Sequence, residues 1–514
     1  MAFDYENKDT GGGTATTINK GDADSVSVKS RDVQEWMDRS LLPRTLIQGT
    51  YGMKKAGNSF LPAHTLESTK AYNGRLSRST LLNAFKKTAS FLAGQVFQSD
   101  VVFDDGVDPA FEEWAESIDA AENSLDVFAK RVFQNGISKG VAHVFIDVPK
   151  KEADVVSQKD EKDAGIRPYF KEIKPEDVLG AIINEDGFLV QLRISESVVL
   201  RVGKYGTKIV QRVRVLEPGL WELYEMDDNG ASSMIDSGAF SIPIIPLVTF
   251  IPGDEWTIIT GETPIMDLAE LNSKHWRSMS DQDNILSVAR VPILFGKNIE
   301  IEKMPVGTAT MVTSEDNDAD MKFIEIQGNA IAAGREDLKE TEAQMALYGL
   351  QQLVPRTGNM TATEKALTSA ESNSSLGTWA TEFESVLNAC FDIAGQFMSK
   401  EWPDNGLSVN KEYNFGVADP DELNAILKSN DQGILSAQAT FSEFRRRGVF
   451  EEHLSWDDME ADLEKEKQDN IDMARMAGAA FGEAPGDGEG EGEETPEEKA
   501  AREQEEAKKK EGNK

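Results

Sequence analysis

Residues 263–290 read TPIMDLAELNSKHWRSMSDQDNILSVAR and predict one long helix with a narrow apolar stripe. Thr263 can cap a helix, and a proline in the first helical position gives up no hydrogen bond. Apolar residues recur at three- and four-residue steps, while Asn, Ser, Asp and Gln fill the remaining faces. We therefore expect a helix of about 40 Å that packs against its neighbours along one side.

The chain after this helix predicts a small β module and a returning helix. Short β-like stretches come first, and their residues are 291–295, 308–313 and 322–326. A second helical pattern then runs from about residue 330 to 353. A helix, a β module and a second helix in this order predict a protruding hairpin.

A break and a third helix follow the hairpin. Val354-Pro355 ends the second helix, and the capping box Thr361-Ala362-Thr363-Glu364 begins a helix that can reach Ser399. Residues 369–377 contain few large apolar side chains, so we expect a bend there. The predicted loop between these two helices therefore covers residues 354–360.

The sequence before the hairpin predicts an α+β region. Residues 1–30 resemble a flexible arm, and helical periodicity follows over 68–96 and 110–133. Short β-branched stretches then predict a mostly antiparallel sheet, with strands at 141–148, 189–194, 198–202, 209–215 and 244–250.

The C-terminal sequence predicts a small helical unit and a disordered tail. Asp419-Pro420 begins one helix, Gly433 and Gly448 end two, and a third begins near Ser455. From residue 482 onward the chain is acidic and rich in glycine, so it buries too little apolar surface to fold.

Composition excludes several classes of protein. The chain has 514 residues, with 90 Asp and Glu against 54 Lys and Arg, for a net charge of −36. This excess argues against a protein that coats nucleic acid with a basic surface. One cysteine, Cys390, and four histidines leave little material for disulfides or a metal site, and we expect no cofactor. The longest apolar stretch, 242–252, is too short to span a membrane.

Two motifs match known functional patterns only in part. Gly136 to Gly140 fits the G-x-S-x-G pattern around Ser138, but a helix precedes it and a strand follows, which favours an ordinary turn over a hydrolase site. Asp316, Asp318 and Asp320 alternate like calcium ligands, but the glycine and glutamate of an EF-hand are missing. A solvated hairpin tip is favoured there, with a weak divalent site as the alternative.

The run Arg445, Arg446 and Arg447 can be read in two ways. It lies where a helix is expected to end, and cations there complement the helix dipole. A secondary contact with DNA phosphates is the less favoured alternative. Cys390 and His275 lie on predicted helices without partners at ligand spacing, so we interpret both as packing residues.

An ordered set of short motifs resembles the portal proteins of tailed bacteriophages, the ring-shaped head–tail connectors. The opening motifs are Gly49-Thr50, Ala56-Gly57, Leu61-Pro62, Glu67-Ser68, Tyr72, Arg75-Leu76, Arg78, Asn83 and Gly94-Gln95-Val96-Phe97. The later motifs are Ile146 to Pro149, Arg167-Pro168-Tyr169, Ser280-Asp281, Val291 to Leu294, Gln344-Met345-Ala346 and Thr361 to Glu364. Together they cover roughly residues 45–460, and their order carries the resemblance.

The resemblance implies a portal fold with an α/β wing, a two-helix stem, a small β-containing clip and a helical crown. The expected domains are an arm (1–30), wing (31–262), first stem helix (263–290), clip (291–328), second stem helix (329–353), tunnel loop (354–360), long wing helix and return (361–418), crown (419–481) and tail (482–514). It also implies a ring, usually of twelve copies, at one capsid vertex of the virion, assembled in the host cytoplasm and passing double-stranded DNA. The implied partners are the large terminase subunit, the major capsid and scaffolding proteins, and head–tail adaptor or neck proteins, with no membrane.

The resemblance also implies where such a protein meets its partners. The tunnel loop that would contact DNA comprises Pro355, Arg356, Thr357, Gly358 and Asn359, with Arg356 its one charged side chain. A structural role is equally favoured for Arg356, in which it caps helix carbonyls or pairs with a carboxylate of a neighbouring subunit. The clip residues implied in assembly and terminase docking are Val291, Ile293, Met311, Phe323 and Ile326. Two other classes stay open, a hydrolase-type enzyme that uses Ser138 and an acidic oligomeric scaffold that is not a portal.

Overall fold

The computed structural model divides the chain into two compact units, residues 1–415 and 416–514. It describes residues 25–149, 167–290, 293–298, 316, 318–324, 328–350, 362–411, 413, 420–446, 449–450, 456, 459–461 and 463–465. Helices and antiparallel strands both contribute, so the α+β class expected from the sequence is confirmed. The division into wing, stem, clip and crown stays a prediction.

The first unit opens with a series of short helices. They are α2 (Arg31–Arg39), α3 (Leu41–Ile47), α4 (Gly49–Ala56), η1 (Gly57–Ser59), α5 (Thr69–Arg78), α6 (Ala84–Val96), α7 (Pro109–Ala115) and α8 (Leu125–Lys139). The helical span expected over 68–96 is therefore two helices. Asn83 begins α6 by accepting a hydrogen bond from the Lys86 amide at 2.9 Å. The span expected over 110–133 is likewise divided, because Asp119 accepts bonds from the Ala121 and Asn123 amides between α7 and α8.

Every described strand pair is antiparallel, as the sequence predicts. One sheet has the order β3-β2-β9 and another the order β4-β5-β6-β7-β8. These strands are β2 (Ala142–Asp147), β3 (Tyr169–Ile173), β4 (Val178–Ile183), β5 (Leu189–Val202), β6 (Gly206–Glu217), β7 (Leu220–Met226), β8 (Ser232–Ala239) and β9 (Leu247–Phe250). The 3-10 turn η2 (Pro175–Asp177) joins β3 to β4. Short pairs β1–β14 (Val102–Phe103 with Leu407–Ser408) and β10–β11 (Glu255–Thr257 with Thr260–Gly261) complete the described strands outside the hairpin.

Two expected strands, 189–194 and 198–202, are one continuous strand, β5. Glu196 interrupts the apolar pattern, but its carboxylate lies 2.8 Å from Lys171 and 3.2 Å from Arg214. Paired in this way, a charged residue can remain within the sheet. The strand expected over 244–250 begins only at Leu247, directly after Pro246, which has no amide to donate to a ladder.

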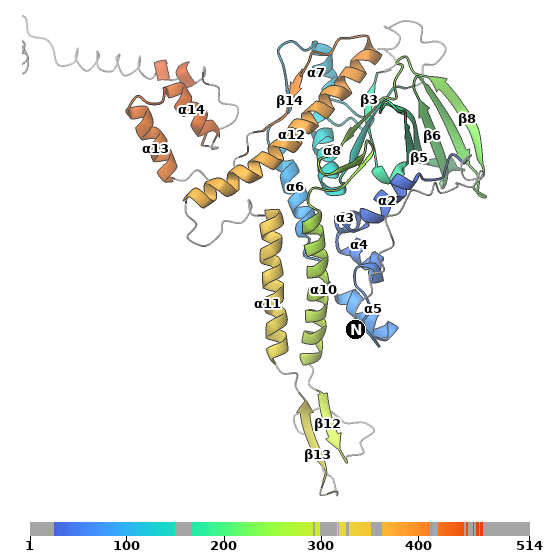
Figure 1. The fold of residues 1–514 in the computed structure, drawn as a ribbon, viewed down its shortest axis with the longest axis vertical. Coiled ribbons are helices and arrows are strands. Elements are labelled where there is room, and N and C mark those ends of the chain that lie inside the picture. Colours follow the sequence, from blue (N-terminus) through green and yellow to red (C-terminus); the bar gives the residue numbers. More distant parts are fainter. Residues whose placement is uncertain are drawn as a thin grey trace, which may run out of the picture. The chain divides into compact units, whose positions relative to one another are not determined.

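Helix α10 (Met266–Ala289), the strands β12 (Ile293–Lys297) and β13 (Asp320–Ile324), and helix α11 (Gly328–Met345) form the expected helix–β–helix hairpin. Figure 1 shows α10 and α11 side by side, with the β12–β13 pair beyond their far end. A short π-helix, η3 (Ala346–Leu350), extends α11. Helix α12 (Ala362–Met398) runs through 369–377 without interruption, so the expected bend produces no break in the helix.

The main core lies where α6, α8, α10 and α12 meet the three-stranded sheet. Aromatic rings dominate it, with Phe133 stacked on Phe250 at 5.4 Å between centroids and edge-on to Phe383 at 5.3 Å. A second cluster, which includes Phe145, Leu192 and Leu216, fills the space between the two larger sheets. The main core contains residues from the first half of α10, and the second cluster contains none from this helix.

The second unit contains α13 (Pro420–Asp431) and α14 (Ala437–Arg446). Gly433 follows α13 with φ of +71°, the left-handed conformation expected of a helix-ending glycine. Phe441, Phe444, Phe450 and Trp456 form an aromatic cluster within this unit. The described residues thus agree with a small helical unit after residue 416. The expected arm over residues 1–24 and the tail over 482–514 lie outside the described residues.

Candidate functional site: the helix pair and its β-hairpin

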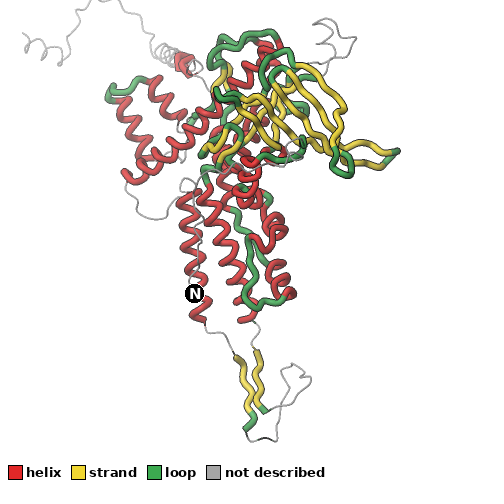
Figure 2. The backbone as a smooth tube through the Cα atoms, turned by 45° about the vertical axis from the view of Figure 1, so that its right-hand side comes forward, coloured by secondary structure: helices red, strands yellow, loops and turns green. Residues whose placement is uncertain are grey.

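Helix α10 has different neighbours on its different sides. Its first half carries Leu268, Ala269 and Trp276 into the main core, where each is at most 1% exposed. Its polar residues face α11 on one side and the segment from η1 to α6 on another. Figures 1 and 2 both show α10 with α11 and the N-terminal helices alongside it. The mixed polarity of residues 263–290 therefore reflects a helix that packs on several sides.

Polar contacts and one glycine join α10 to α11. His275 Nε2 lies 3.1 Å from Glu342 Oε1, and Lys274 lies 3.4 Å from Asp337. The Gln282 side chain donates to the Ile331 carbonyl at 3.0 Å. A Cβ on Gly334 would lie 2.3 Å from Gln282 Oε1, so glycine leaves room for that side chain. The expectation that His275 is a packing residue is refined, because the ring also bridges the two helices.

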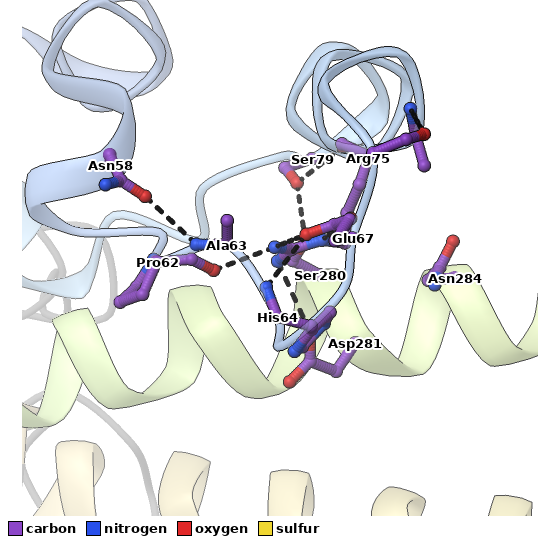
Figure 3. A network of polar contacts seen from close by, with 12 residues as sticks. Asn58, Pro62, Ala63, His64, Glu67, Arg75, Ser79, Ser280, Asp281 and Asn284 are labelled. Atoms are coloured by element: carbon purple, nitrogen blue, oxygen red, sulfur yellow. Dashed lines mark hydrogen bonds and ion pairs between the residues drawn. The ribbon is translucent and has the colours of Figure 1, made fainter.

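A buried arginine fastens the N-terminal segment to the opposite side of α10 (Figure 3). Only 2% of the Arg75 side chain is exposed. Its Nε and Nη2 donate to the two carboxylate oxygens of Glu67 at 3.0 and 2.8 Å, and Nη2 also donates to the Pro62 carbonyl at 2.8 Å. Asp281 of α10 lies 3.5 Å from Nη1 and 3.2 Å from His64 Nε2. The arginine therefore links two segments that are about 200 residues apart in sequence.

The bidentate pairing changes the acidity of both partners. The Arg75 guanidinium hydrogen-bonds the Glu67 carboxylate and lowers its pKa to about 2. The same bonds raise the pKa of Arg75. Both groups are therefore charged at neutral pH, as a planar guanidinium–carboxylate pair in a buried setting requires.

Two further polar contacts extend this attachment along α10. Ser79 Oγ bonds Ser280 Oγ at 2.8 Å, and the Arg78 guanidinium donates to Asn284 Oδ1 at 3.2 Å. Nearer the core, the Asn272 side chain accepts from the Phe85 amide at 3.0 Å and donates to the Leu82 carbonyl at 2.8 Å. Several of these residues belong to the motifs of the resemblance, but the sequence alone does not indicate their structural role. The only available signal was the pairing of Glu67 with Arg75, eight positions apart.

At the other end of α11, η3 brings the chain against the core. A Cβ on Gly349 would lie 2.4 Å from Leu268 Cδ2 and 2.8 Å from Thr88 Oγ1. The backbone of η3 therefore contacts both α10 and α6 closely. The predicted tunnel loop, with Pro355, Arg356, Thr357, Gly358 and Asn359, follows at once and lies outside the described residues.

The β12–β13 hairpin carries part of the predicted docking set. Ile293 pairs with Ile324, and Leu294 pairs with Phe323, in an antiparallel register that extends to Lys297 and Asp320. Val291, Met311 and Ile326 of the same set lie outside the described residues. Isolated two-stranded hairpins are marginally stable in water, so this one is suited to pairing with another molecule.

The remaining sequence motifs have plain structural roles in the described residues. Ser138 lies in the last turn of α8, 1% exposed, and donates to the Gln134 carbonyl. Gly140 then ends the helix with φ of +85°, as an ordinary helix-to-strand turn does. Asp316 Oδ1 accepts from the Asp318 amide at 2.9 Å in an exposed turn before β13. Arg445 is exposed near the C-terminal end of α14, which closes at Arg446, while Arg447 is outside the described residues.

Two buried titratable side chains lie in the core. His143 is fully buried, and burial lowers its pKa to about 4. Cys390 is also fully buried, and burial raises the pKa of its thiol. Within the described ranges, no three His, Cys, Asp or Glu side chains gather closely enough to hold a metal ion. No helix in those ranges combines the length and apolar character needed to cross a membrane.

Comparisons with known proteins give one family match and several similar structures. A family described as a domain of unknown function (DUF4055) matches residues 264–398, which begin just before α10 and end with α12. No curated protein sequence matches the chain. Similar solved structures include a chain of the virion of the native gene transfer agent (GTA) particle. It is 11% identical with a TM-score of 0.40, over 80% of this chain and 92% of that chain.

Two further similar chains come from the neck of GTA particles. One, from the native particle neck with C12 symmetry, is 9% identical with a TM-score of 0.37, over 71% of this chain and 89% of that chain. The other, from the empty particle neck with C6 symmetry, is 10% identical with a TM-score of 0.40, over 70% and 89%. TM-scores this low do not establish a shared fold, so the proposals below rest on the residues of this chain.

Proposed function

We propose that this chain is a phage portal protein, a subunit of a ring through which double-stranded DNA enters and leaves a capsid. The ordered motifs over residues 45–460 support this proposal. The observation that carries it is the α10–β12/β13–α11 hairpin, because the resemblance implies a helix pair that carries a small β module. In this role the chain is a conduit and not a catalyst.

The described contacts suit a helix pair that must stay rigid beside a moving polymer. Arg75, Asn272 and Ser280 fasten α10 to the N-terminal helices, and His275 with Gln282 fastens it to α11. Each contact is a defined hydrogen bond or ion pair that fixes the relative position of two elements. The acid excess of the chain also suits a channel, because a repulsive or weakly interacting wall lets phosphates slide past.

The proposal makes a direct prediction about the size of the purified full-length chain. Mass photometry and negative-stain images should show discrete rings near twelve times the chain mass of 56.6 kDa. A monomer at micromolar concentration would overturn the proposal. An irregular aggregate or a compact oligomer without a central channel would instead favour an acidic scaffold.

DNA passage is a separate part of the proposal and rests on the segment 354–360. Arg356 is its one charged side chain, and twelve such residues would contact successive phosphates without base preference. Arg356→Glu should therefore leave rings intact but reduce DNA packaging or retention. Arg356→Lys is the matched control and should retain most of the DNA packaging. Packaging by the Glu variant at the parental level would remove Arg356 from this role.

Terminase and neck proteins are proposed to dock at the β12–β13 hairpin. Phe323 lies on β13, and an aspartate there would place a charge in a strand that needs a partner. Phe323→Asp and Met311→Asp should therefore weaken assembly or terminase binding. Rings and terminase binding at the parental level in both variants would contradict this assignment.

The hydrolase alternative receives no support from the position of Ser138. Its hydroxyl already donates to a helix carbonyl, and its side chain is buried in the last turn of α8. A nucleophile elbow would instead expose the hydroxyl on a strand-to-helix turn. Hydrolase activity of the parent that disappears in Ser138→Ala would nevertheless overturn the proposal.

A further inference from the structure

The end of the β5–β6 hairpin extends beyond the rest of its sheet. The β4 strand pairs with β5 only up to Ile194, and β7 pairs with β6 only from Arg212 onward. Residues 197–202 and 206–211 therefore pair only with each other. We call residues 197–211 the distal ribbon. A lone two-stranded ribbon is marginally stable in water, so this one would gain from a covering partner.

Both faces of the distal ribbon expose apolar side chains. Val199 and Ile209 are register partners on one face, and they are 62% and 63% exposed. Leu200 and Val202 lie on the opposite face, because alternate residues of a strand point to opposite sides, and they are 38% and 55% exposed. Tyr205 in the turn is 86% exposed. An apolar surface of this kind on a projecting element is typical of a protein-binding site.

The distal ribbon is also basic within a strongly acidic chain. It holds Arg201, Lys204 and Lys208 and no Asp or Glu, although the whole chain carries a net charge of −36. Lys208 lies 3.7 Å from the exposed Asp228 of the β7–β8 turn, which offsets part of this charge. Among the described residues, Arg201 donates to the Lys204 carbonyl, and Lys204 lies over the Tyr205 ring. The ribbon therefore presents cations and apolar side chains together.

A complementary surface is present elsewhere on the same chain. Residues 88–129 contain ten Asp and Glu and no Lys or Arg. Six of these acidic residues, which we call the acidic surface, are exposed around α7: Asp104, Asp105, Glu112, Glu113, Glu116 and Glu122. The structure shows no ion pair for these six side chains within the described residues. Their charges are therefore available to a second molecule.

We infer that the distal ribbon docks on the acidic surface of a second copy of this chain. Charge complementarity identifies the occupant, because the ribbon's cations match the six carboxylates around α7 that have no ion pair among the described residues, while its apolar faces gain from burial. Such a contact joins two different surfaces, so it repeats head to tail and closes into a ring when the rotation permits. The inference deepens the proposed ring assembly and rests on it. A nucleic acid is the less favoured occupant, because the exposed aliphatic side chains on both faces offer nothing to a phosphate backbone.

Charge reversal on each side tests the contact. The ribbon variant is Arg201→Glu with Lys208→Glu, and the surface variant is Glu113→Lys with Glu116→Lys. Each should weaken assembly of the full chain at least tenfold at low salt, measured by mass photometry across a dilution series. The variant with all four changes should regain assembly, because the reversed charges again attract. Lys70→Glu with Lys87→Glu is the control for the ribbon variant, since it makes the same change in net charge as that variant on exposed positions of α5 and α6 and should assemble like the parent.

The apolar part of the contact has its own test. Val199→Ser with Ile209→Ser should also weaken assembly, and circular dichroism should confirm that every variant is folded. If these residues matter only for folding, the serine variant will lose its β-sheet signal together with assembly, and the charge-reversal set then decides the question alone.

The outcomes separate this inference from the proposed function. If the ribbon variant forms rings of the parental size with the parental dependence on concentration, the inference is wrong and the portal proposal still stands. A parent that never assembles would overturn both. Failure of the four-change variant to regain assembly would also count against a direct contact between the two surfaces. Unchanged rings that retain less DNA in the ribbon variant would identify nucleic acid as the occupant.

Discussion

At the scale of single residues, Arg75 shows how a buried charge can hold two distant segments together. Its guanidinium is nearly inaccessible to water, so its charge depends on Glu67, on the Pro62 carbonyl and on the half-exposed Asp281. A buried ion pair stabilises a fold little compared with an apolar pair, but the removal of one partner is strongly destabilising. The network therefore specifies where α5 and its preceding loop meet α10.

Removal of the Glu67 charge is the sharpest test of this network. Glu67→Gln leaves a buried guanidinium without its main partner, and we expect a loss of about 2–4 kcal/mol in the free energy of unfolding. Because the folded-state pKa of Glu67 is about 2, against an ordinary value of 4.5, its contribution is fully present above pH 4.5 and lost as pH falls toward 2. Chemical denaturation at several pH values should show less acid destabilisation in the variant than in the parent. An equal slope in both would contradict this account. Glu35→Gln, on an exposed surface, is the control.

His143 also loses stability as pH falls, because its folded-state pKa is lowered too, but it does so over a higher pH range than Glu67. Burial lowers its folded-state pKa from 6.5 to about 4, so the unfolded chain binds a proton more readily between these values. The neutral ring therefore costs nothing above pH 6.5, and the fold loses about 2 kcal/mol between pH 6.5 and 5. His143→Gln can still bond Thr249, which lies 3.0 Å from His143 Nδ1, but it cannot titrate. Denaturation curves at pH 7 and pH 5 should differ less for the variant. An undiminished difference would show that other groups control this pH range.

At the scale of secondary-structure elements, local patterns predicted more than long-range contacts. The three- and four-residue spacing and Pro264 predicted α10, and the return pattern predicted α11 within a few residues. The break between α5 and α6 was missed, because Leu81 and Leu82 continue the apolar period. Its cause is partly non-local, since Asn272 of α10 bonds the first turn of α6.

The candidate site could be predicted only in outline. The helix–β–helix order is visible in the sequence because each part has its own periodicity. The partners of Arg75 are not visible, because Asp281 reaches it only after α10 packs against α5. The distal ribbon was hidden in the same way, since Glu196 and Ser197 divide the apolar run and suggest two strands where there is one. The local sequence does not reveal the partner of a charged residue when that partner is distant in the sequence.

Two helical glycines provide a matched prediction at this scale. A Cβ on Gly349 would overlap Leu268 and Thr88, whereas a Cβ on Gly377 in α12 would meet nothing within 4 Å. Gly349→Ala should therefore destabilise the fold by about 1–3 kcal/mol through overpacking. Gly377→Ala should stabilise it by about 0.5–1 kcal/mol, because alanine has a higher helix propensity than glycine. Thermal unfolding would measure both, and a stabilised Gly349→Ala would show that η3 does not pack closely on α10.

At the scale of the whole molecule, charge and packing are distributed unevenly. The acidic stretch 88–129 and the basic ribbon lie in the first unit, so its surface carries complementary regions despite the net charge of −36. The hydrophobic clusters of this unit draw on residues from Val33 to Tyr413. Among the described residues, the aromatic cluster of the second unit consists of Phe441, Phe444, Phe450 and Trp456. Each unit therefore has a separate core, which has consequences for truncation.

A chain that ends after residue 415 should fold without the second unit. It retains every member of the three buried clusters, including the β1–β14 pair that ties residues 407–408 to the first unit. We expect a cooperative thermal transition within a few degrees of the main transition of the full chain.

A chain that ends after residue 481 is the control, and it should also form rings of unchanged size, because the acidic tail has no apolar anchor. Loss of cooperative unfolding in the shorter chain alone would mean that the first unit needs residues 416–481 to complete its core. If the chain ending at 481 runs as monomers, the tail is an assembly element. If both chains unfold cooperatively and only the shorter one fails to form rings, the helical unit acts in assembly and not in folding, which is the outcome that would assign it a role between copies.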